Sequence, residues 1–132
     1  MTEELYWLVL TALMTSLFWM PYILNRIALR GLMGGMANPS PNDKPQADWA
    51  NRAQAAHKNA VENLVIFAPL VLATHALGVG TSLTATMCMV YFVARLAHFI
   101  VYTAGIPVAR TLTFAAGFAA QLILALNLLG MM

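Results

Sequence analysis

The placement of the charged residues constrains this fold more than any other feature of the sequence. No Asp, Glu, Lys or Arg occurs in three long stretches, 5–25, 63–94 and 111–132. Each stretch can hold at least one helix of about 20 residues, enough to cross a hydrocarbon core of ~30 Å. Of the 132 residues, 61% are hydrophobic and only 9% are charged. Because small soluble domains bury only ~60–70% of their unfolded surface, the apolar surplus indicates an all-α integral membrane protein.

Turn-forming residues divide the chain into four expected helices. Glycine and proline predict an irregular loop over about 30–48, and Gly78 and Gly105 predict two tighter turns. Asp48 is a candidate N-cap for a long second helix, and Pro107 suits the first turn of the fourth. We expect one four-helix membrane domain over residues 1–132, with spans at about 5–29, 58–77, 82–103 and 108–129.

Lysine and arginine favour one side of the membrane. The second expected loop contains neither residue type, and Arg110 directly follows the third loop. Positive residues in short loops stay on the cytoplasmic side, so both termini are expected on the other side. The short loops suit a bacterial inner membrane, and a net charge of +2 gives no indication of nucleic-acid binding. The first loop and its flanks hold Arg26, Arg30, Lys44, Arg52 and Lys58.

Several polar side chains nevertheless fall within the expected helices. A charge at the centre of a membrane helix costs at least ~2.5–3.5 kcal/mol, so such residues generally face a bundle interior or a wet cavity. At 100° per residue, Arg95, His98 and Tyr102 form a narrow stripe on the third helix. Lys58 can pair with Glu62 four residues later, or Glu62 can pair with Arg95. Arg52, Asn59, Glu62 and Asn63 share one third of the second helix, and Arg110, Phe114, Gly117 and Gln121 share a face of the fourth.

This set of side chains favours an anionic ligand. It combines several cations with one carboxylate, amides and hydroxyls, and it lacks a Ser–His–Asp set, a phosphate loop and a metal-ligand cluster. Arginine binds carboxylates through two parallel hydrogen bonds, and Glu62 could receive an amine. The pattern therefore suggests a small polyanion that carries one cationic group.

Three motifs in order resemble the MAPEG family, the membrane-associated proteins in eicosanoid and glutathione metabolism. The first is Arg-Ala-Gln-Ala-Ala-His-Lys-Asn-Ala-Val-Glu-Asn over 52–63. The second is Arg-x-x-His-x-x-x-Tyr over 95–102. The third is Arg-Thr-x-x-Phe over 110–114, where the prostaglandin E synthase branch of the family has Arg-Ser-x-x-Tyr. The similarity extends over nearly the whole chain.

The resemblance implies a homotrimer of four-helix bundles that binds glutathione between neighbouring subunits, near the cytoplasmic side. Arg110 and Thr111 would lie near the glutathione thiol. The first helix would contribute Arg30, or Arg26 one turn earlier. The remaining candidate contacts to glutathione are Arg52, Lys58, Asn59, Glu62, Arg95, His98 and Tyr102.

On this basis we expect a glutathione-dependent transferase or peroxidase. A thiol with a pKa of ~8.5 is mostly protonated at neutral pH, and only the thiolate is nucleophilic. Lowering that pKa by two units requires about 2.7 kcal/mol of preferential stabilisation of the anion. Arg110 could supply this charge and Thr111 a hydrogen bond, so that the thiolate attacks an apolar electrophile or a lipid hydroperoxide from the bilayer.

Departures from the family pattern keep two alternatives open. Lys58 stands where the prostaglandin synthase branch usually has arginine, Ala55 replaces a basic residue, and Phe114 lacks the hydroxyl of a tyrosine. These changes favour a catalytically silent scaffold or lipid-binding protein as the first alternative. A small four-helix exporter is the second, and the absence of an acidic residue from 5–25 argues against it.

Overall fold

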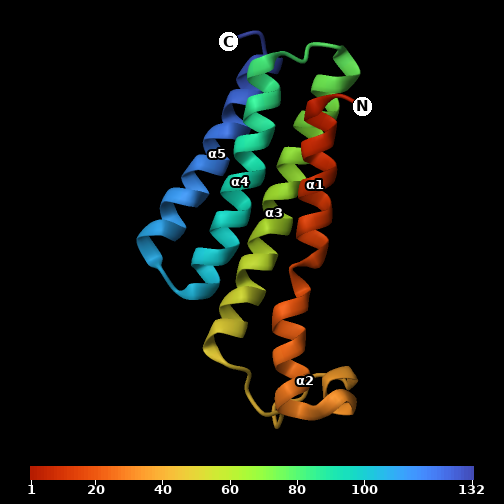
Figure 1. The fold of residues 1–132 in the computed structure, drawn as a ribbon, viewed down its shortest axis with the longest axis vertical. Helices are drawn as coiled ribbons and strands as arrows, with labels where there is room; N and C mark the ends of the chain where they lie inside the picture. Colours follow the sequence, from red (N-terminus) through yellow and green to blue (C-terminus); the bar gives the residue numbers. More distant parts are fainter.

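The computed structural model describes residues 1–132 as a bundle of long helices (Figure 1). Four helical segments are long and apolar enough to cross a membrane, and α1 and α2 together form the first of them, Glu3–Met36. The all-α, four-span membrane fold expected from the sequence is confirmed. The helices are α1 Glu3–Leu17, α2 Trp19–Met36, α3 Asp48–Leu77, α4 Ser82–Ala104 and α5 Pro107–Leu128.

Pro21 accounts for the boundary between α1 and α2. Proline has no backbone N–H, so the carbonyl of Leu17 lacks its usual donor four residues later. Phe18 keeps helical angles, φ −66° and ψ −15°, and its N–H bonds to the Thr15 carbonyl over 3.3 Å. The first span is therefore one nearly continuous helix with a single tighter turn at Phe18.

Two boundaries near the first loop differ from the expectation. The chain stays helical to Met36 instead of becoming irregular at residue 30, because Gly31 absorbs a sharp turn with φ 72° and ψ 168°. Asp48 is the first residue of α3, and its side chain does not cap the helix; Ala47 holds the cap position. The Asp48 carboxylate still lies in the first turn, where the positive end of the helix dipole favours it.

Two clusters of buried side chains hold the helices together. One is centred on Phe67 and Tyr91, whose rings stack with centroids 3.8 Å apart between α3 and α4. The other is centred on Phe18 and Phe99, stacked at 3.9 Å between the first span and α4. Small residues let α3 approach its neighbours closely, as is common in membrane helix packing. These are Ala53, Ala56 and Ala60, all fully or almost fully buried.

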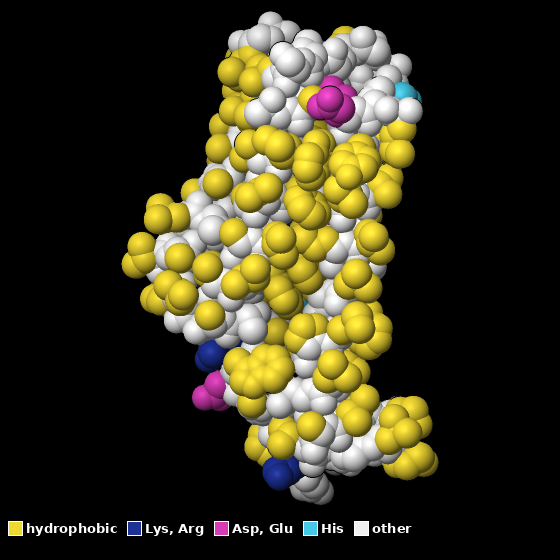
Figure 2. Space-filling view, viewed as in Figure 1, with side chains coloured by type: hydrophobic (Ala, Val, Ile, Leu, Met, Phe, Trp, Pro, Cys, Tyr) yellow, Lys and Arg dark blue, Asp and Glu magenta, His cyan; other side chains and the backbone are white.

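The outside of the bundle is apolar along most of its length (Figure 2). The charged side chains visible on this face gather toward the two ends. Large side chains on the outer surface remain exposed in the isolated chain, as a lipid-facing surface requires. Among them are Val9, Leu13, Val65, Leu72, Val93, Ile100, Leu112 and Phe118.

The connections between helices lie at different heights (Figure 1). Both termini and the α3–α4 turn are at one end of the molecule, and the first loop is at the other. The α4–α5 connection lies part of the way along α3, which continues beyond it toward the first loop. Gly78 and Gly105 end α3 and α4 in the left-handed conformation, with φ 65° and 80°, and Pro107 opens α5 as the sequence predicts.

Candidate functional site

Two adjoining hollows open beside the connection between α4 and α5. Each has a volume of about 200 Å³, and they share Tyr102 and Arg110. Residues from α3, α4 and α5 line them, so the site exists only because the bundle brings these helices together. The outer hollow is completed by Arg52, Gly105, Ile106 and Pro107, and the inner hollow by Asn59, His98, Thr111 and Phe114.

Arg52 joins α3 to the end of α4. Its Nε donates a hydrogen bond of 3.0 Å to the Thr103 carbonyl. A cation is favourable there because the last carbonyls of a helix carry partial negative charge. Gly105 makes the approach possible, since a Cβ added to it would lie 3.2 Å from Arg52 Cζ. A side chain at residue 105 would therefore force the Arg52 guanidinium to shift by a few tenths of an ångström.

Arg110 and Tyr102 form the wall that the two hollows share. The guanidinium carbon of Arg110 lies 4.8 Å from the centre of the Tyr102 ring, a distance typical of a cation–π contact. His98, one turn earlier on α4, meets Tyr102 edge-to-face at 5.5 Å. His98 is buried, and its Nδ1 has no hydrogen-bond partner within the chain. The inner hollow thus has an aromatic wall, and Nδ1 of His98 is buried away from the solvent.

A partly buried series of polar side chains supports the inner hollow. Arg95 is only 2% exposed, and its Nη2 donates to Asn59 Oδ1. Asn63 Nδ2 donates to the Asn59 carbonyl over 2.9 Å, and Gln121 Nε2 donates to the Asn63 carbonyl over 3.1 Å. Arg95 lines neither hollow and forms no ion pair with Glu62. Arg95 therefore orients the Asn59 side chain without itself lining a hollow.

Lys58 and Glu62 lie on a different face of α3. They line a groove of about 640 Å³ between α2 and α3, and they form no ion pair with each other. The phenol oxygen of Tyr22 and Nδ1 of His57 are 2.8 Å apart and join the two helices in this groove. Within a single chain, Lys58 and Glu62 therefore lie apart from the two hollows. The groove is completed by Asn51, Gln54, Ala55 and Val61.

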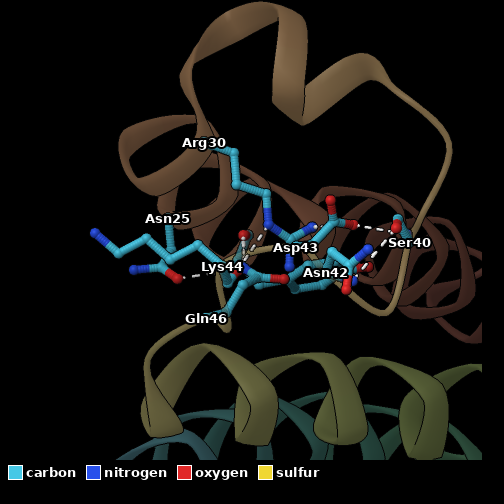
Figure 3. Close-up of polar contacts among 8 residues, drawn as sticks. Asn25, Arg30, Ser40, Asn42, Asp43, Lys44 and Gln46 are labelled. Carbon is cyan, nitrogen blue, oxygen red and sulfur yellow. Dashed lines mark hydrogen bonds and ion pairs between the residues drawn. The ribbon is translucent and has the colours of Figure 1, made fainter.

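Arg30 belongs to a cluster in the first loop (Figure 3). Its Nε donates to the Lys44 carbonyl over 2.9 Å, and its Nη1 lies 3.5 Å from Asp43 Oδ2 in the chain's one ion pair. Arg30 lines neither the hollows nor the groove. Thr111, in contrast, lines the inner hollow, and its hydroxyl donates to the Pro107 carbonyl over 3.3 Å.

The electrostatic character of the two hollows is positive. Arg52 and Arg110 line them, and no Asp or Glu does. The sequence analysis named Arg52, Tyr102 and Arg110 as candidates but did not include Gly105, Ile106 and Pro107, which also line the outer hollow. The close approach of Arg52 to Gly105 joins two distant segments, and no local pattern in the sequence signals it.

The fold and the site define a multi-pass helical membrane protein with a cationic pocket between its helices. The chain belongs to the MAPEG family, whose family model matches residues 5–130. No curated protein and no solved structure shows significant similarity to this chain. Membership connects the chain to a family generally associated with glutathione and confirms the resemblance of the sequence motifs.

Proposed function

We propose that this protein is a membrane-bound glutathione-dependent transferase or peroxidase. The observation that carries the proposal is a pocket lined by Arg52 and Arg110 without a single carboxylate. Such a pocket suits an anionic ligand because an unpaired carboxylate or thiolate gains charge-assisted hydrogen bonds there. Glutathione carries two carboxylates, one ammonium group and a thiol, and the MAPEG family is associated with it.

A second copy of the chain would complete the site. Ligand pockets usually have volumes of ~300–1,000 Å³, whereas each hollow has about 200 Å³. The groove holding Lys58 and Glu62 lies on another face of α3 and offers a carboxylate for the glutathione ammonium group. We propose a homotrimer in which this groove of one subunit faces the hollows of the next.

The proposed chemistry is activation of the glutathione thiol. Arg110 would stabilise the thiolate by charge, and the Thr111 hydroxyl would turn from the Pro107 carbonyl to donate a hydrogen bond to sulfur. In conjugation, the thiol proton leaves to water and the thiolate forms a C–S bond with an apolar electrophile. In a substitution the bond from that carbon to the leaving group breaks, and in an addition the electrons of the C=C bond take up a proton from water. In peroxide reduction, sulfur attacks the terminal peroxide oxygen and the O–O bond breaks, which gives a sulfenic acid and releases the alcohol after protonation. A second glutathione thiol then displaces the hydroxyl group from that sulfur, giving the disulfide and water.

The apolar reactant would come from the bilayer. Phe114 lines the inner hollow and is 38% exposed on the outer face of α5. An apolar molecule dissolved in lipid could reach the hollow there without crossing water. We place the arginine-rich end on the cytoplasmic side of a bacterial inner membrane, where glutathione would be available.

Isothermal titration of the detergent-solubilised protein with glutathione tests the proposal. We expect saturable binding and an ultraviolet thiolate band for bound glutathione. Arg110→Gln should abolish that band while the protein remains folded, and Lys44→Gln, an exposed change in the first loop, should leave it intact. No binding by the folded wild-type protein would refute the proposed function.

Phe114 favours one alternative, a binding protein without turnover. It presents a ring and no hydroxyl to the hollow, with Arg95 Cζ 6.0 Å from its centre. Turnover of a panel of electrophiles and lipid hydroperoxides separates the two functions. A protein that binds glutathione but converts none of these would be a silent member of the family.

A further inference from the structure

The end of α2 turns sideways and projects from the bundle (Figure 1). The turn occurs at Gly31, with φ 72° and ψ 168°, a conformation essentially restricted to glycine. The five residues that follow, 32–36, remain helical in character. We call this segment the hook. Its direction is set by a backbone conformation that other residues at position 31 would strongly resist.

The hook has two different faces. Gly34 and Gly35 pack against the preceding part of α2, because a Cβ on either would lie 2.9 Å from a side-chain atom of Arg30 or Ile27. The large apolar residues point the other way, with Leu32 61%, Met33 77% and Met36 67% exposed. Figure 2 shows an apolar projection at this end of the molecule. The side-chain sizes therefore force the apolar residues outward.

Polar contacts hold the hook in place (Figure 3). Arg30, directly before the turn, donates a hydrogen bond to the Lys44 carbonyl and forms an ion pair with Asp43, both in the part of the loop that leads to α3. Gln46 Nε2 donates to the Tyr22 carbonyl over 2.7 Å, which ties the end of the loop back to α2. These contacts hold in place the segment that carries the exposed apolar side chains.

The height of the hook matches the boundary of a bilayer. The helical path from Glu3 to Arg30 is about 42 Å long at ~1.5 Å per residue. This equals the ~40–45 Å thickness of a bilayer that includes its headgroups. Trp49, 39% exposed in the first turn of α3, is a residue type enriched at membrane interfaces. The hook therefore emerges at the level of the headgroups, on the side of the first loop.

We propose that the hook lies flat in this interface, with Leu32, Met33 and Met36 inserted among the lipids of the leaflet nearest the first loop. Apolar side chains gain free energy by leaving water, and an amphipathic segment in the interface plane provides that environment. Arg26 and the exposed Lys44 form no ion pair within the chain, so they suit anionic headgroups. The occupant of this surface is an anionic phospholipid bilayer.

Spin labels on the full-length protein in vesicles test the proposal. The vesicles contain phosphatidylcholine and phosphatidylglycerol, and the label is attached to Met33→Cys or, separately, Leu32→Cys. Ser40→Cys, also exposed in the same loop, is the matched control. The native Cys88 is fully buried, so the unsubstituted protein measures background labelling.

We expect collisions with oxygen, which concentrates in lipid, to exceed collisions with a water-soluble nickel chelate at positions 32 and 33. The reverse order is expected at position 40. Nickel accessibility at 33 equal to that at 40 would place the hook in water and overturn the proposal. Shielding of 33 from both reagents would show that protein covers the hook, and would also overturn it. None of these outcomes depends on glutathione.

Discussion

Arg110 on α5 lies over the ring of Tyr102 on α4, with 4.8 Å between the guanidinium carbon and the ring centre. This contact holds a cation at the wall shared by both hollows. Cation–π contacts contribute ~0.5–2 kcal/mol, and 1.4 kcal/mol corresponds to a tenfold change in affinity. We expect Tyr102→Leu to weaken glutathione binding by about 2- to 30-fold in isothermal titration. Tyr102→Phe keeps the ring and should retain most of the affinity; equal losses in the two variants would assign the effect to the hydroxyl.

Asn59 is the hydrogen-bond acceptor for the buried Arg95 guanidinium. Hydrogen bonds to charged groups contribute ~1.5–3 kcal/mol, so Asn59→Leu should destabilise the protein by about that amount. The measurement is thermal unfolding in detergent without glutathione. Asn59→Asp retains an acceptor and should unfold close to the wild-type temperature. An unchanged melting temperature for the leucine variant would show that Arg95 finds another partner.

The sequence predicted four helices of membrane-spanning length because a bilayer imposes strict requirements. A helix must stay apolar for about 20 residues, so stretches without charge locate the crossings almost directly. The first loop was harder to predict. Glycine and proline there indicate irregular chain, but the turn at Gly31 lets Gly34 and Gly35 pack against Arg30 and Ile27, and residue types alone do not indicate that backbone conformation.

The site was predictable in its residue types and less so in its pairings. Helical periodicity grouped Arg95, His98 and Tyr102 on one stripe of α4. His98 and Tyr102 line the inner hollow, whereas Arg95 lines neither hollow and donates to Asn59. Whether Arg95 meets Asn59 or Glu62 depends on how far α3 is rotated about its axis, and a shared third of its circumference does not resolve that. In the structure, Asn59 accepts the hydrogen bond from Arg95, and Glu62 lines the groove between α2 and α3.

Glu4 is buried at the opposite end of the molecule, a feature that the sequence did not reveal. It is 7% exposed, and its Oε1 accepts a 2.6 Å hydrogen bond from the Thr84 hydroxyl. Gly80 leaves room for the carboxylate, since a Cβ there would lie 2.7 Å from Oε1. We expect Glu4→Ala and Thr84→Val to interact in a double-mutant cycle by about 1.5–3 kcal/mol, measured by thermal unfolding.

Thr84 has a second role that requires a control for this cycle. Its Oγ1 also accepts from the Thr81 N–H in the capping box of α4, so Thr84→Val loses the cap as well. Thr84→Ser preserves both contacts and should remain close to wild type. Strictly additive losses in the cycle would mean that the Glu4 contact contributes nothing beyond the cap.

Gly105 allows Arg52 to lie close to the end of α4, and Gly105→Ala tests what depends on this contact. Alanine at φ 80° strains the backbone by about 1–2 kcal/mol, and its methyl group would lie 3.2 Å from Arg52 Cζ. We expect a lower melting temperature and weaker glutathione binding, because the Arg52 guanidinium that lines the outer hollow must shift.

Gly78→Ala is the matched control for this prediction. Gly78 ends α3 with φ 65°, close to the conformation of Gly105, and a Cβ there meets no atom within 4 Å. This variant should carry a similar backbone strain at the far end of the bundle and bind glutathione normally. If both variants lost affinity equally at matched stability, the loss would come from general strain, and the position of Arg52 would not matter for binding.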